Sequence, residues 1–157
     1  MDAATWLADL GIGDLKYTSM TIGADGLGLI SYYDKTNENL KVAHCANTAC
    51  TSVTTTTIDS TGIVGGYSSS TIGADGLGLI SYVDQTNETL KVAHCDNTNC
   101  TSATKTTLDE TGTVGEFSSI TIGADGLGLI SYYDNTNGDL KVAHCDNTFC
   151  TPYFRRR

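Results

Sequence analysis

The sequence predicts an all-β fold that consists of three tandem copies of one four-stranded antiparallel unit. Two observations lead to this prediction. The twelve residues TIGADGLGLISY occur unchanged at 21–32, 71–82 and 121–132, so the chain repeats with a period of 50 residues. Within each period, short runs rich in β-branched and aromatic residues alternate with Gly, Asn and Asp, which is typical of strands separated by turns. A fixed period of this length indicates units that stack on their neighbours to bury their faces.

The first predicted strand of each unit ends at an Asp-Gly pair, as in YTSMTIGAD (residues 17–25). Glycine accepts a positive φ without steric cost, so Asp-Gly between apolar segments favours a tight hairpin turn. The pair recurs as Asp25 and Gly26, Asp75 and Gly76, and Asp125 and Gly126. We therefore interpret the three carboxylates as turn residues. The strand itself is lined with small residues, which indicates a crowded position.

The second predicted strand, LGLISYYD (residues 27–34), carries bulky side chains on both faces. Leu29 and Tyr33 alternate with Ile30 and Tyr32, so neither face is suited to water. This pattern predicts a central strand between packed sheets.

The third strand, LKVAHC (residues 40–45), follows an Asp- and Asn-rich turn, and the fourth, TSVTTTTID (residues 51–59), is polar on both faces. Small residues on the inside and polar residues on the outside are typical of a propeller blade. We therefore expect a β-propeller-like array of four-stranded antiparallel blades, three per chain. The expected units are an N-terminal strand at 1–16, repeat 1 at 17–66, repeat 2 at 67–116 and a truncated repeat 3 at 117–157.

Six cysteines form three pairs of equal spacing: Cys45 and Cys50, Cys95 and Cys100, and Cys145 and Cys150. Each pair joins the end of a third strand to the start of a fourth, so disulfides here would staple the outer hairpin. Disulfides persist in oxidising compartments, which predicts an extracellular or cell-surface protein. The rival interpretation, a zinc-type site made by His44, Cys45 and Cys50, has too few ligands per repeat.

Charge and hydropathy exclude two classes of partner. Eighteen acidic and nine basic side chains give a formal net charge of −9, which repels nucleic acid and anionic lipid. No apolar run approaches the roughly 20 residues that span a bilayer. We expect neither nucleic-acid binding nor a membrane span.

No group of residues predicts catalysis, a cofactor or a metal site. His44, His94 and His144 adjoin cysteines, and we interpret them as buried histidines with a hydrogen-bonding neighbour, because no nucleophile or carboxylate stands at a telling spacing. Asp134 and Asp139 match part of a calcium loop, but the other two units lose the second carboxylate. We therefore expect a protein that is not an enzyme and has no cofactor.

The segment SSITIGADGLGLISYYDNTNGDLKVAHC resembles the repeats of large bacterial and environmental extracellular proteins with the pattern DGxPxISYYDxxNxDLKxA. The resemblance implies β-propellers distantly similar to the Asp-box blades of sialidases. Two departures limit it. Gly28, Gly78 and Gly128 stand where such repeats often have Pro, and the Asp-box Trp is replaced in its neighbourhood by tyrosine. A sialidase site is not implied, because the only arginines are the three at the C-terminus.

Three blades are too few for a closed ring, since propellers typically have four to eight. By the period of 50, Asp9 aligns with Asp59 and Asp109, so AATWLAD (residues 3–9) falls where a fourth strand would be. The third unit instead ends in TPYFRRR (residues 151–157), inside the equivalent strand. Residues 1–16 therefore offer a strand that completes a blade of the same or a neighbouring chain.

We accordingly expect a structural protein that self-assembles with copies of itself into a ring or a helical filament by strand exchange. The near-identity of the units fits recent duplication equally well. The alternative function is multivalent glycan binding, in which Tyr33, Tyr133 and Tyr153 stack on sugars and several sites add avidity.

Overall fold

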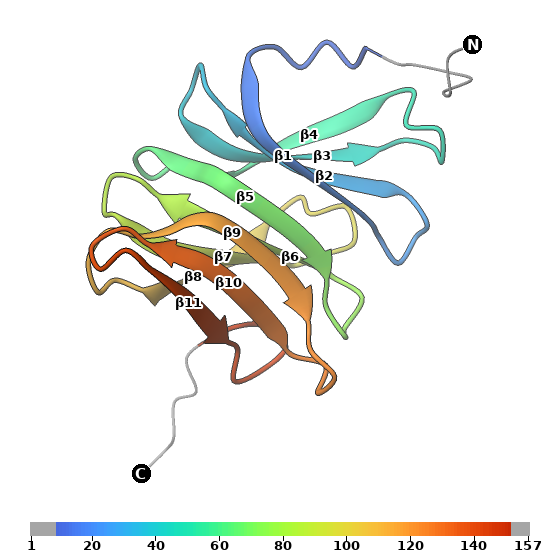
Figure 1. The fold of residues 1–157 in the computed structure, drawn as a ribbon. Coiled ribbons are helices and arrows are strands. Elements are labelled where there is room, and N and C mark those ends of the chain that lie inside the picture. Colours follow the sequence, from blue (N-terminus) through green and yellow to red (C-terminus); the bar gives the residue numbers. More distant parts are fainter. Residues whose placement is uncertain (1–8, 152–157) are drawn as a thin grey trace, which may run out of the picture.

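The structure is a computed structural model that describes residues 9–151. Eleven strands form three antiparallel sheets (Figure 1). The first sheet contains β1 (Leu15–Ile22), β2 (Gly28–Asp34), β3 (Asn39–Cys45) and β4 (Val53–Asp59). The second contains β5 (Val64–Ile72), β6 (Gly78–Asp84), β7 (Thr89–Cys95) and β8 (Ala103–Asp109). The third contains β9 (Val114–Ile122), β10 (Gly128–Asp134) and β11 (Asp139–His144).

Each sheet is an up-and-down meander, in which every strand pairs with its neighbour in sequence. The inner strands β1, β5 and β9 lie side by side, with β5 in the middle, and the sheets stack behind them as blades (Figure 1). The predicted all-β fold with three blades per chain is therefore confirmed. Within the described residues the third blade has three strands rather than four.

The Asp-Gly segments lie in a longer turn than the two-residue hairpin that the dipeptide favours. Ile22 pairs with Gly28, which leaves five residues between the strands. The amide of Gly23 donates to the carbonyl of Leu27 at 2.8 Å, and Asp25 Oδ1 accepts the Leu27 amide at 3.0 Å. The Asp25 carboxylate thus closes a five-residue loop, whereas a two-residue turn would not need this hydrogen bond. Gly26 supplies the positive φ of 79° in the loop.

The hydrophobic core lies between blades, because each sheet is too thin to have an interior of its own. Two clusters of buried side chains occur, and each takes its members from two neighbouring blades. The first joins Leu29, Leu40, Val42 and Ile58 to Val64, Ile80, Tyr82, Ala93, Cys95 and Cys100. The second joins Leu79, Leu90 and Val92 to Val114, Ile120, Ile130, Tyr132, Cys145 and Cys150. We call each of these blade-to-blade contacts a joint.

Gly65 shows how closely the blades approach at a joint. Its φ is 104°, and a Cβ at this position would lie 2.7 Å from the Cα of Leu40 in the preceding blade. Any side chain here would push the two backbones apart. The tight joint therefore depends on glycine at the start of the inner strand.

Candidate functional site

Within residues 9–151, each end of the blade stack has one joint-forming face that no other blade covers. In blade 3, Leu140 is 78% exposed and Val142 is 58% exposed, although the corresponding residues of blades 1 and 2 are fully buried: Leu40, Val42, Leu90 and Val92. In blade 1, Met20 and Ile22 are 54% and 59% exposed. Exposed apolar patches of this kind mark interaction surfaces. The two faces are the opposite halves of one joint.

A groove of about 530 Å³ follows β11 at the C-terminal end of the stack, and we call it the C-terminal groove. Its lining includes Thr107, Asp109, Lys141, Val142 and Thr151. In the complete blades a fourth strand pairs with the third. In blade 3, β11 has no such neighbour among the described residues. The groove therefore combines an unpaired strand edge, which readily accepts another strand, with exposed apolar side chains.

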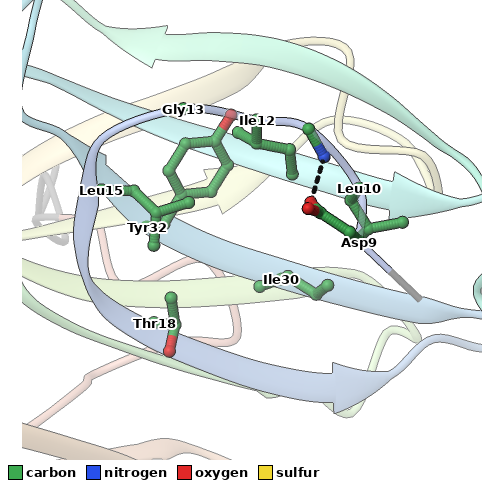
Figure 2. A pocket seen from close by; sticks show the side chains of 9 residues that line it. Asp9, Leu10, Ile12, Gly13, Leu15, Thr18, Ile30 and Tyr32 are labelled. Carbon is green, nitrogen blue, oxygen red and sulfur yellow. Dashed lines mark hydrogen bonds between the residues drawn. The ribbon is translucent and has the colours of Figure 1, made fainter. Parts of the chain in front are cut away.

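A cleft of about 710 Å³ lies at the other end of the stack, and we call it the N-terminal cleft (Figure 2). Asp9, Leu10 and Ile12 line it from the segment before β1, and Ile30 and Tyr32 line it from β2. The internal counterparts of this face are covered by a preceding blade. In blade 3, for example, Ile120 occupies the position of Met20 and is buried.

An aspartate at the end of a fourth strand links each pair of blades. Asp59 Oδ2 accepts hydrogen bonds from the hydroxyl of Tyr82 at 2.7 Å and from Nζ of Lys91 at 2.9 Å, and both donors belong to the next blade. Burial of Asp59 opposes its ionisation, but these hydrogen bonds outweigh it and hold the pKa of the carboxyl below its ordinary value. Burial and the carboxylate raise the pKa of Tyr82, so its hydroxyl remains a donor.

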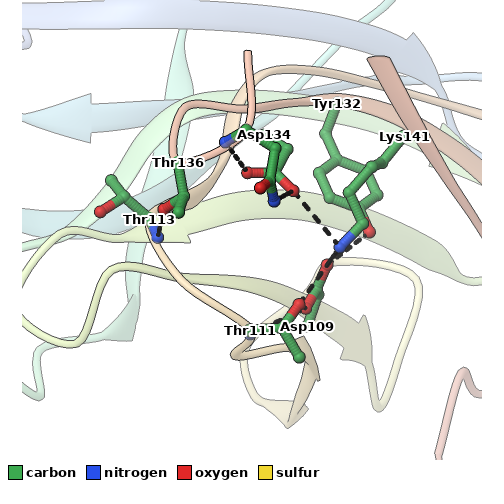
Figure 3. A network of polar contacts seen from close by, with 8 residues as sticks. Asp109, Thr111, Thr113, Tyr132, Asp134, Thr136 and Lys141 are labelled. Carbon is green, nitrogen blue, oxygen red and sulfur yellow. Dashed lines mark hydrogen bonds and ion pairs between the residues drawn. The ribbon is translucent and has the colours of Figure 1, made fainter. Parts of the chain in front are cut away.

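The second joint repeats this network (Figure 3). Asp109 Oδ2 accepts from the Tyr132 hydroxyl at 2.7 Å and from Nζ of Lys141, and Asp109 Oδ1 accepts from the Thr111 amide at 2.9 Å. Lys141 also lies 3.8 Å from Asp134. Burial again opposes ionisation, and the donors again lower the pKa of Asp109. The repetition indicates that the aspartate is part of the joint itself.

Blade 1 has the same two donors, Tyr32 and Lys41, but within residues 9–151 no aspartate from a fourth strand contacts them. The Tyr32 hydroxyl is buried and has no hydrogen-bond partner within residues 9–151, and Nζ of Lys41 lies 3.5 Å from Asp34. A buried polar group without a partner costs about 1–3 kcal/mol. Asp9, which aligns with Asp59, instead accepts the amide of Gly11 at 2.9 Å (Figure 2).

Serine side chains join the inner strands of neighbouring blades. The Ser68 hydroxyl donates to the carbonyl of Tyr17 at 2.7 Å, and the Ser118 hydroxyl donates to that of Tyr67 at 2.9 Å. Ser19 Oγ accepts the amide of Ser70 at 3.0 Å. Only small polar side chains could bridge strands this close, which explains the composition of the first strand of each unit.

The three histidines each contact the turn aspartate of their own blade. Nε2 of His44, His94 and His144 lies 2.8, 2.7 and 2.7 Å from Oδ2 of Asp25, Asp75 and Asp125, respectively. Residues 19 apart meet here because β2 and β3 pair in register, which we did not anticipate from the sequence. His144 is the most exposed of the three, because no further blade covers it within the described residues, whereas the ring of Phe149 covers His94 at a centroid distance of 4.8 Å.

A row of aromatic rings crosses the inner strands, and the sequence analysis missed it. Tyr17 and Tyr67 have ring centroids 4.4 Å apart, and Tyr67 and Phe117 have centroids 4.7 Å apart. Burial and the Tyr17 hydroxyl raise the pKa of Tyr67 to about 12. All three residues have φ between 51° and 56°, which is unusual for bulky side chains. Their recurrence at the period of 50 was the available signal.

The residues singled out for glycan contact are dispersed. Tyr33 is only 8% exposed and its ring lies 6.3 Å from that of Tyr17, so it is not the surface residue that we expected. Tyr133 is half-buried, with its ring 6.4 Å from Phe117. Tyr153 lies outside the described residues, as do residues 1–8 of the expected N-terminal strand and residues 152–157 of repeat 3.

All six cysteines form disulfides: Cys45 with Cys50, Cys95 with Cys100, and Cys145 with Cys150. Their sulfurs are bonded to one another, so the rival zinc-type site of His44, Cys45 and Cys50 is not formed. Across residues 9–151, no group of three or more His, Cys, Asp or Glu side chains is placed to hold a metal ion. Asp134 instead accepts the amide of Asn137 at 3.0 Å and so closes its own turn.

Comparison with known proteins shows the fold but no family. No family model and no curated protein matches the sequence. Among solved structures, an α-L-arabinofuranosidase from Lactobacillus brevis matches 86% of this chain and 50% of its own, with a TM-score of 0.53 and 11% identity. An endo-arabinase from Bacteroides thetaiotaomicron matches 90% of this chain and 57% of its own, with a TM-score of 0.51 and 14% identity.

A fucose lectin from Kordia zhangzhouensis matches 83% of this chain and 99% of its own, with a TM-score of 0.48 and 10% identity. In contrast to the lectin, the arabinofuranosidase and the endo-arabinase are about twice as long as the part that this chain matches. At these identities, the first two matches support the propeller-like fold alone. The described part of the chain contains no helix long and apolar enough to cross a membrane.

Proposed function

We propose that this protein is a non-catalytic, extracellular structural protein that assembles head to tail with copies of itself. In this assembly, residues 3–9 of one copy lie along β11 of the preceding copy and serve as the fourth strand of its third blade. The N-terminal face of blade 1 then covers the C-terminal face of that blade. The contact between copies thereby reproduces a joint that already occurs twice within the chain.

One observation carries the proposal: Leu140 and Val142 are exposed, although the same residues at the same positions of blades 1 and 2 are completely buried. Full burial of side chains of this size contributes about 1.5–3 kcal/mol each. A second copy would add Met20 and Ile22 to the buried set, together with a ladder of strand hydrogen bonds. These gains are what must exceed the estimated 4–15 kcal/mol cost of association.

The test is the size distribution of the purified protein by sedimentation velocity and negative-stain electron microscopy. We expect rings or filaments for the natural chain and smaller species for Val142→Lys, because the lysine places a charge in the joint. Thr55→Lys is the matched control, since it adds the same charge to the exposed outer strand of a complete blade, where the corresponding residue of blade 2 is Lys105. Equal sizes for Val142→Lys and the natural chain would overturn the proposal.

A second candidate function, multivalent glycan binding, is favoured by the aromatic row of Tyr17, Tyr67 and Phe117. Aromatic faces stack on the apolar face of a sugar ring, and Phe117 is 67% exposed. Retention on a glycan array that is lost in Phe117→Ala would support this function. Retention that is independent of the row, or no retention at all, would oppose it.

A further inference from the structure

The N-terminal cleft is lined by a hydrogen-bond donor that has no acceptor among residues 9–151, the hydroxyl of Tyr32. Tyr32 is buried, and its hydroxyl has no partner within the described residues. In both internal joints the equivalent hydroxyl and the equivalent lysine share one carboxylate oxygen. Tyr32 and Lys41 stand at the equivalent positions of blade 1, where Lys41 Nζ lies 3.5 Å from Asp34 and the Tyr32 hydroxyl has no acceptor within the described residues. Blade 1 therefore has the residues of a third carboxylate-binding pair, but the fourth-strand aspartate does not contact them.

The spacing of the sequence identifies the carboxylate that fits. Asp59 precedes Tyr82 by 23 residues and Lys91 by 32 residues, and Asp109 stands at the same distances from Tyr132 and Lys141. The residue at these distances before Tyr32 and Lys41 is Asp9. Asp9 already lines the same cleft as Tyr32 (Figure 2).

The segment after Asp9 differs from its counterparts in a way that explains why the contact is not made. The glycine of positive φ that precedes each inner strand is Gly62 in blade 2, three residues after Asp59. In blade 1 it is Gly13, four residues after Asp9, and Gly11 also has a positive φ, of 61°. Tyr17 and Tyr67 both stand eight residues after these aspartates, but β1 begins at Leu15, six residues after Asp9, whereas β5 begins at Val64, five residues after Asp59. The irregular segment is thus one residue longer in blade 1 and contains a second glycine, so Asp9 can turn back to the Gly11 amide.

We propose that the N-terminal cleft is a carboxylate site that Asp9 fills when a preceding copy docks. Holding residues 3–8 as a strand along β11 of that copy extends the linker, and the carboxylate of Asp9 moves from the Gly11 amide to the Tyr32 hydroxyl and Lys41 Nζ. Asp9 acts as a latch, because strand exchange and closure of the joint then stabilise each other. This inference rests on the proposed head-to-tail assembly and assigns Asp9, Tyr32 and Lys41 to the contact between copies.

The test compares Tyr32→Phe and Asp9→Asn with the natural chain by sedimentation velocity over a range of protein concentrations. We expect each variant to weaken association about tenfold, which corresponds to about 1.4 kcal/mol. The double variant should be no weaker than either single one, because both remove the same contact. Unchanged association in the single variants, or additive losses in the double variant, would overturn the latch.

A second measurement separates the latch from an ordinary structural role of Tyr32. In the Val142→Lys background, which blocks docking, we expect Tyr32→Phe to leave the thermal midpoint unchanged or raise it, because it removes an unpartnered buried hydroxyl. Tyr82→Phe, the matched control in a complete joint, should lower the midpoint. Equal losses for the two variants would contradict the inference.

The same chemistry could be supplied by a free carboxylate, and acetate distinguishes the sources. The thermal midpoint of the Val142→Lys protein is compared in acetate and in chloride at equal ionic strength, with Tyr32 present and with Tyr32→Phe. If the site belongs to Asp9, acetate should cause no rise in the midpoint that depends on Tyr32. A Tyr32-dependent rise, together with normal association of Asp9→Asn, would assign the site to a soluble carboxylate and overturn the latch. A natural chain that remains monomeric at all concentrations would overturn both the assembly and the latch.

Discussion

The Tyr82 hydroxyl lies 2.7 Å from Oδ2 of Asp59, across the boundary between the first two blades. Asp59 is the last residue of one sheet, and Tyr82 lies in the middle of the next. The contact therefore depends on how the two blades stack, and the structure of one blade alone does not determine it. The second joint contains the equivalent contact between Tyr132 and Asp109, whereas the Tyr32 hydroxyl of blade 1 has no acceptor within the described residues.

Asp59→Ala should destabilise the protein by about 3–5 kcal/mol, because it leaves Tyr82 and Lys91 partly or fully buried without their acceptor. The free energy of unfolding in urea measures this, with Val142→Lys as the background so that association does not contribute. Asp14→Ala is the control: it breaks an exposed pair with Lys35 and should cost under about 1 kcal/mol. Similar losses for both would mean that the joint aspartate contributes no more than a surface charge.

Stability should fall in acid because the pKa values of Asp59 and Asp109 are lowered in the folded state. In the unfolded chain an aspartate has a pKa of about 3.9. The stabilisation is therefore complete above that value and is lost as the pH falls through the lower folded pKa. We expect a plateau in the free energy of unfolding at neutral pH and a decline below about pH 5.

Asp109→Asn tests the assignment of that decline. It should lower stability at pH 7 and reduce the slope between about pH 5 and pH 2, since one of the titrating groups has been removed. An unchanged slope would show that other carboxylates, such as Asp25, whose pKa is also lowered, account for the acid sensitivity.

Two leucines at the same position of the repeat should respond differently to truncation. Leu90→Ala should cost about 2–5 kcal/mol, because Leu90 is fully buried in the second joint. Leu140→Ala in the non-assembling background should cost under about 1 kcal/mol, because its side chain is mostly in water. In the assembling chain, Leu140→Ala should also weaken association. Equal costs in the non-assembling background would contradict the open third blade.

Removing one disulfide should lower stability by about 2 kcal/mol, because each bond closes a loop of only a few residues. The double variant Cys95→Ser and Cys100→Ser tests this in the central blade, where both cysteines are buried.

Intact-mass analysis of native material should show the loss of six hydrogens. Six free thiols would contradict the three disulfides, and an unaltered urea midpoint in the double variant would show that the staple is not needed.

Much of the fold could be predicted from the sequence, because its signals are local and repeated three times. Asp25-Gly26 marks a hairpin, Leu29 to Tyr33 mark a strand covered on both faces, and Cys45 and Cys50 lie at the ends of one connection. The candidate site was harder to predict. The pairing of His44 with Asp25 needs the register of β2 and β3, and the contact between Asp59 and Tyr82 needs the stacking of two sheets. Tyr33 was expected at the surface, although the alternation in LGLISYYD already indicated a strand covered on both faces; it is 8% exposed and its ring lies beside that of Tyr17.

The sequence by itself determined the period, the strands of each blade and the place of the cysteines, since turn chemistry and alternation act over a few residues. It also indicated that residues 3–9 match a fourth strand. Only the tertiary structure decided which faces become joints, where the core lies and which of three equivalent tyrosines lacks its acceptor. The physical reason is that Tyr32, Tyr82 and Tyr132 stand in identical twelve-residue segments. Their surroundings differ only because blade 1 has no blade before it within the described chain.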